Sequence, residues 1–344
     1  MSEAYQPGSL RYRLGLGVAA LLVIVCAAWG VSRFRDFVAT ATPGAPTDLP
    51  PIPEVKAIPE RVEVPDSLLG LSGALRFRTL TGAEALHVPG FLAVLGEGAI
   101  RIPDVHLVAT RVGDQFAYIV LRPFGEKQGE RLNGYRLGRW PAERWIISRN
   151  YFNPDGFVEV TESNAGLKLS EHFALGDFLT HDQRDAWPKY VVLEEKLIDK
   201  LELVLQDLNR RGVATRHVVV LSGFRAPYYN DRGVGEGMAR TSRHQYGDAA
   251  DIVIDDDGNG RMDDLNGDGR VDLRDTGVIS QAIQAVEKAH PSLVGGLGTY
   301  IATGPRGPFA HVDVRGTSAR WENRGSARPV PNAAPPRSPA PGPR

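Results

Sequence analysis

The 344-residue chain has a single cysteine, Cys26. One cysteine excludes a disulfide within the chain and a cysteine-based metal site, so any metal site must use histidine, aspartate or glutamate. The chain also lacks an excess of either charge, because 40 lysines and arginines stand against 41 aspartates and glutamates. No whole-chain field therefore attracts nucleic acid, and we expect no nucleic-acid partner.

Long apolar runs are scarce, and the longest extends from Leu14 to Val31, with 18 uncharged residues behind Arg11 and Arg13. This length is near the lower limit for a helix that crosses a bilayer. A cleaved signal peptide would have a shorter apolar core and a clearer cleavage site, although cleavage stays an alternative. We predict an uncleaved membrane anchor over residues 1–38, with most of the chain outside the cytoplasm.

The chain changes composition several times after this segment. Residues 39–66 contain seven prolines, which is typical of a semi-extended linker. Residues 67–165 contain short apolar runs broken by glycine and predict a small β-rich accessory domain. Its expected strands are 75–78, 105–112, 116–121 and 145–147. From Gly316 onward we expect a tail, which is disordered over 322–344 because proline and arginine replace apolar residues.

Residues 166–321 have a different pattern. Leucines and valines recur at helical spacing over about 191–211, which predicts an amphipathic helix that ends at Gly212. The apolar run 218–221 predicts a buried strand, and the sequence Ser222-Gly223-Phe224-Arg225 follows directly at its end. Functional groups commonly lie on loops that such strands position.

The strongest motif is Ser-x-His-x-x-Gly-x-Ala-x-Asp, which begins at Ser242 and contains His244, Gly247 and Asp251. An apolar strand, 252–254, follows Asp251, and Gly247 allows the chain to turn before it. Sixty residues later His311 lies in a second apolar strand. Two imidazoles and one carboxylate, with a fourth position for water, suit catalytic zinc. We therefore predict a mononuclear zinc site with His244, Asp251 and His311 as ligands.

These segments resemble the M15 family of zinc peptidases, the D-alanyl-D-alanine carboxypeptidase and murein endopeptidase group. The resemblance covers about 168–321 and rests on five elements in order. They are Leu-Ser-x-x-Phe from Leu169, Ser-Gly-Phe-Arg with Asn230, the His…Asp segment, His-Val-Asp-Val-Arg from His311, and Trp321. It implies an α+β fold, a mixed helix and antiparallel-sheet zinc peptidase domain over 166–321, preceded by the small β-rich domain.

The resemblance also implies roles for individual residues. Arg225 would bind a carbonyl or carboxylate of the substrate, as a planar guanidinium can, with Asn230 and Ser242 also in the substrate site. Many relatives have a Glu-x-x-His base, but Pro308 stands at the glutamate position. Because His311 and Asp313 are two apart in a strand and face the same way, we expect Asp313 to be the general base. The opposite assignment, with Asp313 on the metal and His311 as base, stays open.

The function implied is a zinc metallopeptidase of the bacterial inner membrane, with its catalytic part in the periplasm or extracytoplasmic space. It would hydrolyse peptide bonds in peptidoglycan stem peptides or cross-links, as a carboxypeptidase or an endopeptidase. The alternative is a catalytically inactive protein that binds cell-wall peptides through the same fold. The expected partners are thus a peptidoglycan peptide and, through the N-terminal helix, the membrane.

An acidic insertion, 255–275, contains eight aspartates in 21 residues. Its second part matches a calcium loop at most ligand positions, although the twelfth residue is aspartate instead of glutamate, as in dockerin-type loops. We predict calcium as a second cofactor, and a poorer overlapping copy begins at Asp255. Calcium-dependent docking of a partner is a third hypothesis. The predicted calcium ligands are Asp264, Asn266, Asp268, Arg270, Asp272 and Asp275.

Overall fold

The computed structural model describes residues 64–88, 104–109, 115–144, 151–235, 237–301 and 305–323. The chain divides into two units, Met1–Ile58 and Pro59–Arg344, and the described residues all belong to the second. The predicted N-terminal anchor, nearly all of the linker, the strand expected at 145–147 and the tail beyond 323 lie outside the described residues.

The prediction of a membrane protein needs correction. No helix in the described part of the chain has the length and apolar character that crossing a bilayer requires. This finding contradicts the predicted single-pass topology, the inner-membrane location and the membrane as a partner. The segment that carried the prediction, 14–31, is not among the described residues.

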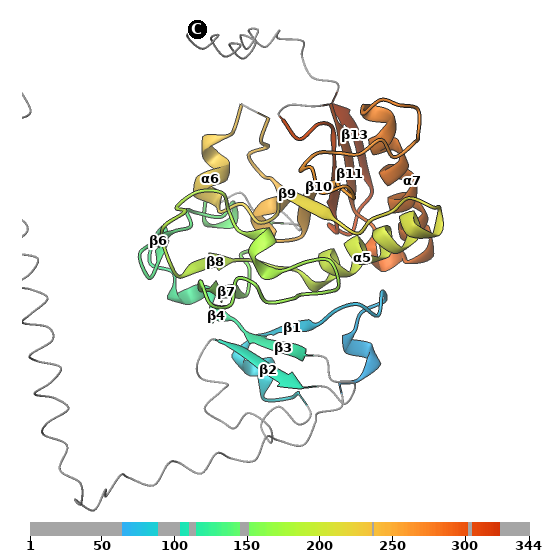
Figure 1. The fold of residues 1–344 in the computed structure, drawn as a ribbon. Helices are drawn as coiled ribbons and strands as arrows, with labels where there is room; N and C mark the ends of the chain where they lie inside the picture. The colour runs from blue at the N-terminus through green and yellow to red at the C-terminus, as the bar shows by residue number, and fades with distance from the viewer. Residues whose placement is uncertain are drawn as a thin grey trace, which may run out of the picture. The chain divides into compact units, whose positions relative to one another are not determined.

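The described residues form a mixed α/β structure with several small sheets, most of whose strand pairs are antiparallel (Figure 1). In the first sheet, β1 (Phe77–Leu80) runs parallel to β3 (Gln115–Val120), which pairs antiparallel with β2 (Val105–Ala109). In the second, β7 (Gly156–Val160) pairs with β4 (Arg122–Pro123) and β8 (Lys189–Val191). A hairpin joins β5 (Arg131–Leu132) and β6 (Tyr135–Arg136).

The largest sheet has five strands in the order β13-β11-β12-β10-β9. Four of its strands pair antiparallel, and β13 runs parallel to β11. The bounds are β9 Val218–Ser222, β10 Ala249–Ile254, β11 Gly296–Tyr300, β12 Phe309–Asp313 and β13 Ala319–Asn323. The sequence pattern predicted β9, β10 and β12, but it missed β13 because that strand is polar and partly exposed.

Two long helices support this sheet. Helix α5 (Glu195–Arg210) buries its row of leucines, as the spacing predicted, and packs against α7 (Leu273–Ala289), which contacts β11 and β12. Helix α7 begins with a capping box. The Asp272 side chain accepts from the backbone of the first turn, and the Asp275 side chain accepts from the backbone N–H of Asp272. The short helices are α2 (Gly82–Ala85), α6 (Pro227–Arg232) and the 3₁₀ turns Asp66–Leu68, Phe124–Glu126, Ala142–Arg144, Leu175–Phe178, Arg243–Tyr246 and Pro291–Leu293.

One apolar core connects the first two sheets to the largest one. It extends from Phe77 in β1 through Phe157 in β7 to Val312 in β12, all fully buried. The boundary predicted near residue 165 falls between β7 and β8, which are neighbours in one sheet. The β-rich part and the largest sheet therefore share their interior.

Candidate metal centre

The site is built on one row of residues across the largest sheet. The pairing register aligns Ser222, Asp251, His311, Gly298 and Trp321, in the order β9, β10, β12, β11 and β13. Residues directly opposite each other on paired strands present their side chains on the same face. Register alone therefore brings Asp251 beside His311, although 60 residues separate them in the chain.

His244 reaches this row from the 3₁₀ turn before β10. The turn ends at Gly247, whose φ of 67° lies in the left-handed region, as the predicted turn requires. A side chain at this position would also collide with the backbone carbonyl of Val192. The chain therefore reverses within a few residues, so that His244 and Asp251 meet on the same side of the sheet.

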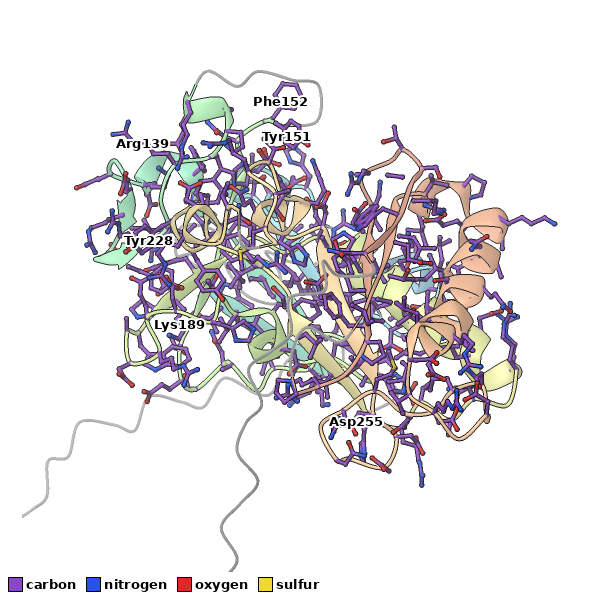
Figure 2. All side chains as sticks on the ribbon, turned by 90° about the horizontal axis from the view of Figure 1, so that it is seen from above. Arg139, Tyr151, Phe152, Lys189, Tyr228 and Asp255 are labelled. Atoms are coloured by element: carbon purple, nitrogen blue, oxygen red, sulfur yellow. The ribbon has the colours of Figure 1, made fainter. Side chains whose placement is uncertain are left out.

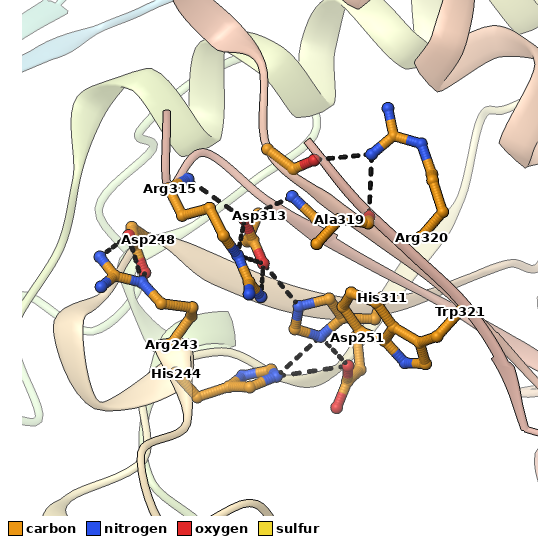
Figure 3. Close-up of polar contacts among 12 residues, drawn as sticks. Arg243, His244, Asp248, Asp251, His311, Asp313, Arg315, Ala319, Arg320 and Trp321 are labelled. Atoms are coloured by element: carbon orange, nitrogen blue, oxygen red, sulfur yellow. Dashed lines mark hydrogen bonds and ion pairs between the residues drawn. The ribbon is translucent and has the colours of Figure 1, made fainter. Parts of the chain in front are cut away.

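Three potential ligand atoms converge there (Figure 3). His244 Nε2 lies 3.1 Å from His311 Nδ1 and 3.3 Å from Asp251 Oδ1. His311 Nδ1 lies 2.9 Å from the same carboxylate oxygen. All three side chains are buried, with at most 6% of each residue exposed. This buried group could bind a metal ion.

Hydrogen bonds on the far side of each ring fix which nitrogen faces the group. His244 Nδ1 lies 2.7 Å from the carbonyl oxygen of Gly223, which can only accept a hydrogen bond. His311 Nε2 lies 3.1 Å from a carboxylate oxygen of Asp313. With a proton on each of these outer nitrogens, His244 Nε2 and His311 Nδ1 are the ring atoms left to bind a metal ion beside Asp251. Such outer partners are what orients histidine ligands in metal proteins.

The protonation states of His244 and Asp251 also suit a metal. Burial is the largest influence on His244 and lowers its pKa to about 4, so the ring is neutral at pH 7. Burial opposes the ionisation of Asp251, but the two histidines and Arg225 outweigh it and hold the pKa of that carboxyl well below its usual range. Burial opposes protonation of His311, but hydrogen bonds to Asp251 and Asp313 outweigh it and raise the pKa of that ring. A neutral imidazole and an ionised carboxylate are the forms that bind metals, so a metal ion would have to displace a proton from His311.

Asp313 does not lie where the predicted general base should be. It is fully buried and contacts Nε2 of His311, the ring nitrogen that faces away from the other two ligand atoms. Both of its oxygens accept hydrogen bonds from Arg315 (Figure 3). One of them also accepts from the backbone N–H of Gly296, 2.6 Å away. With these donors around it, Asp313 is placed to orient His311. The same contacts place His311, and not Asp313, with the other ligand atoms.

Arg225 lies at the site, but its guanidinium already has partners. It forms an ion pair with the second carboxylate oxygen of Asp251, and its Nε donates a 2.7 Å hydrogen bond to Ser222 Oγ. These contacts hold Asp251 with its first oxygen toward the histidines. The guanidinium also lines the cavity above the metal centre, so the predicted contact with a substrate stays a prediction.

The two other predicted substrate residues differ in their placement. Ser242 lines the cavity beside His244. Asn230, in α6, is fully buried and does not line it. Its amide donates to the backbone carbonyl of Ala239, 2.9 Å away, so Asn230 supports the segment that leads to Ser242. Its expected role in binding substrate does not fit this position.

A cavity of about 570 Å³ opens over the metal centre. Aromatic side chains form much of its wall, and Trp321 lies over His311 with ring centres 5.1 Å apart. Trp321 also donates a 2.8 Å hydrogen bond to the hydroxyl of Tyr300. The glycine at position 298 makes this possible, since a side chain there would collide with the indole. The cavity wall includes Tyr151, Tyr300, Phe309 and Trp321.

Sequence reasoning included Arg315 in the element that begins at His311 but gave it no role, and it missed the tyrosines. Arg315 lies two residues after Asp313, but the sequence did not show that its guanidinium would bind that carboxylate. Tyr151 precedes β7, far from the motif in the chain, and reaches the cavity only through tertiary packing. Its contact with Tyr246, at 5.8 Å between ring centres, carries no local sequence signal.

The predicted calcium loop has its carboxylates already in use. Asp264 accepts hydrogen bonds from the backbone N–H groups of residues 267, 268 and 269. Arg274 pairs with both Asp268 and Asp272, and Asp275 caps the start of α7. Asn266 accepts from a backbone N–H of the same loop, and Arg270 is exposed. Among the described residues, these aspartates do not form a group of three that could hold a metal, so the assignment stays a prediction.

Comparison with known proteins gives no relative. No protein-family model matches the chain, and neither a curated protein nor a solved structure is significantly similar to it. The M15 resemblance therefore stays a prediction from the motifs.

Proposed function

We propose that the protein is a zinc peptidase that hydrolyses peptide bonds in peptidoglycan stem peptides or cross-links. The observation that carries the proposal is the convergence of His244 Nε2, His311 Nδ1 and Asp251 Oδ1 within 2.9–3.3 Å of one another. Tetrahedral zinc with bonds of about 2.0–2.1 Å has ligand atoms about 3.3 Å apart. The donor set and its spacing therefore suit zinc.

The ligand count favours catalysis over a purely structural role. Structural zinc sites normally have four protein ligands, whereas catalytic sites have three and leave one position open. Here three protein ligands lie beneath a cavity large enough for part of a peptide. A bound zinc ion supplies a water of lowered pKa and polarises a carbonyl group.

The surrounding residues have assignable tasks in this proposal. Asp313 and Arg315 hold His311 in the tautomer that leaves Nδ1 free, and Arg225 holds Asp251. Trp321 and the other aromatic side chains of the cavity wall offer apolar faces to a substrate. We assign Asp313 to positioning and not to proton transfer, because the ring of His311 separates it from the ligand atoms.

The substrate class rests on the M15 resemblance, and hydrolysis tests it. Full-length zinc-loaded protein is incubated with a stem pentapeptide ending in D-Ala-D-Ala and with a cross-linked peptide dimer, and products are identified by mass spectrometry. Wild type and His87→Ala, a change at an exposed histidine away from the cavity, should cleave one of them. His311→Ala should not.

The product distinguishes the two activities, since a carboxypeptidase releases free alanine and an endopeptidase separates the dimer. No cleavage by the zinc-loaded wild type would contradict the proposal. Binding of the peptide without cleavage would favour the inactive binding protein instead.

A further inference from the structure

The acidic insertion between β10 and α7 consists of two consecutive nine-residue copies, 255–263 and 264–272. Each has the pattern Asp-x-Asp/Asn-x-Asp/Asn-Gly-Arg-x-Asp. This pattern supplies side-chain oxygens at positions 1, 3, 5 and 9 of a calcium loop and glycine at position 6. From the sequence alone the second copy is the better match, because it has a carboxylate at position 12.

The structure reverses this order. In the first copy, one carboxylate oxygen from each of Asp255, Asp257 and Asp263 lies within 4.8 Å of the others. Backbone N–H groups donate to carboxylates in both copies, but in the second copy Arg274 also pairs with Asp268 and Asp272. The first copy therefore brings three negative groups together, while Arg274 neutralises two carboxylates of the second copy.

Asp255 is the residue that points to a ligand. It is only 3% exposed, and its Oδ2 accepts a 2.8 Å hydrogen bond from the backbone N–H of Gly260. Its Oδ1 is buried and has no hydrogen-bond partner. A buried carboxylate oxygen without a partner is costly, and native proteins normally satisfy such groups with a donor, a water or a metal ion.

The aspartates around Asp255 increase the free-energy cost of leaving this carboxylate without a ligand. Burial raises the pKa of Asp263, and the negative charges of Asp257, Asp255 and Asp256 raise it further, against a hydrogen bond from the backbone N–H of Asp256. Asp256 itself turns away and pairs with Arg216. The three clustered aspartates therefore repel one another at the end of β10.

We propose that Asp255, Asp257 and Asp263 bind a calcium ion. The side-chain donors are all oxygen, which excludes the nitrogen and sulfur sets that zinc prefers. Calcium takes six to eight oxygen ligands in flexible geometry, and a glycine-rich loop can add backbone carbonyls and water, whereas magnesium demands a near-ideal octahedron. This site is distinct from the loop predicted at 264–275.

The position of the loop gives the ion a structural consequence. The backbone N–H of Asp263 donates to the carbonyl of Ile254, and that of Met262 donates to Arg306, just before β12. Arg306 in turn donates a 3.0 Å hydrogen bond to the carbonyl of Gly260. The loop therefore connects the ends of β10 and β12, the strands that carry Asp251 and His311.

The two metal sites are separate. Asp255 lies four residues beyond Asp251, or about 13 Å along the strand. Figure 2 shows Asp255 in a loop well apart from Tyr151, which lines the cavity of the metal centre. Calcium should therefore order this loop without entering the reaction.

The test is isothermal titration of calcium chloride into calcium-free, full-length protein, with a melting curve for each variant. We expect one calcium per chain, and a melting temperature about 5 to 10 °C higher at a hundredfold excess over Kd. Asp255→Asn and Asp257→Asn should weaken binding at least about tenfold each. The matched control is Asp256→Asn, which removes a neighbouring charge outside the group and should leave affinity within about threefold.

Under the calcium proposal, Asp255→Asn without calcium should melt at or above the wild-type temperature, because it relieves repulsion and its amide oxygen still accepts from Gly260. If Asp255 had a merely structural role, the same variant should melt below the wild-type temperature. If this variant does not fold, Asp257→Asn carries the test, because Asp257 is exposed. Calcium binding should persist in His244→Ala, because the calcium site does not depend on the zinc centre. The calcium proposal and the zinc proposal can therefore fail separately.

Three results would overturn the proposal. One is the absence of binding up to about 10 mM calcium, beyond the weakest extracellular calcium modules. Another is wild-type affinity in both Asp255→Asn and Asp257→Asn. The third is loss of binding in Asp264→Asn with full binding in Asp255→Asn, which would place the ion in the second copy.

Discussion

Replacing Asp313 with asparagine separates the two roles that this residue has been given. Oδ1 accepts from the backbone N–H of Gly296 and from Arg315, and Oδ2 accepts from His311 Nε2 and Arg315. In an asparagine one of the two oxygens is replaced by an NH₂ group, which cannot accept a hydrogen bond. The groups that donate to that oxygen in the wild type would therefore face a donor. If the NH₂ group faces His311, the ring must move its proton to Nδ1, the atom that faces the metal position.

The expected size follows from the contact that is lost. Removing an outer partner of a histidine ligand typically weakens metal binding 10- to 100-fold, or about 1.4 to 2.8 kcal/mol. Zinc affinity is measured by competition with a chromophoric chelator at constant pH. Asp313→Asn should fall in this range. The matched control is Asp207→Asn, which breaks the ion pairs of a buried aspartate with Arg210 and Arg211 at the end of α5, outside the cavity of the metal centre.

A general base would behave in the opposite way. If Asp313 accepts the proton of the water and nothing more, Asp313→Asn should bind zinc like the wild type and lose only turnover. Wild-type zinc affinity in this variant would therefore refute the positioning role and restore the role predicted from the sequence.

Three further predictions concern the scaffold. Lys200→Met removes the buried partner of Glu287, 2.7 Å away, and should lower the unfolding free energy by about 3 kcal/mol in urea titrations; no loss would contradict the pair's role. Gly247→Ala should cost at least about 1–2 kcal/mol in the same assay because of the left-handed backbone, and an unchanged midpoint would argue against that turn. Hydrogen bonding to Glu202 raises the pKa of His172, so its stabilisation is complete below pH about 6.5 and is lost as pH rises through the folded-state pKa. His172→Gln should flatten the pH dependence of the unfolding free energy above about pH 6.5, and an unchanged slope would show that another group causes it.

The sequence was a good guide where a local pattern decides the structure. Helical leucine spacing predicted α5 within four residues at its start, and apolar runs predicted β9 and β12. The turn at Gly247 follows from the one residue that tolerates its backbone conformation. These features depend on neighbours in the chain, which a sequence displays directly.

The sequence was a poor guide where long-range packing decides. It could not show that Asp313 turns toward the outer nitrogen of His311, because that depends on Arg315 and on the N–H of Gly296. Nor could it show that Asn230 points into the interior. The second calcium copy looked better on motif grounds, but Arg274 and the cap of α7 use its carboxylates.

The central claim is that His244, Asp251 and His311 hold one zinc ion, and metal content tests it most directly. Full-length protein from metal-replete expression is analysed for zinc beside His244→Ala and the exposed-site control His87→Ala. The account predicts about one zinc per chain in the wild type and the control, and loss of that zinc in His244→Ala. No zinc in the wild type, or an equal amount in His244→Ala, would contradict it.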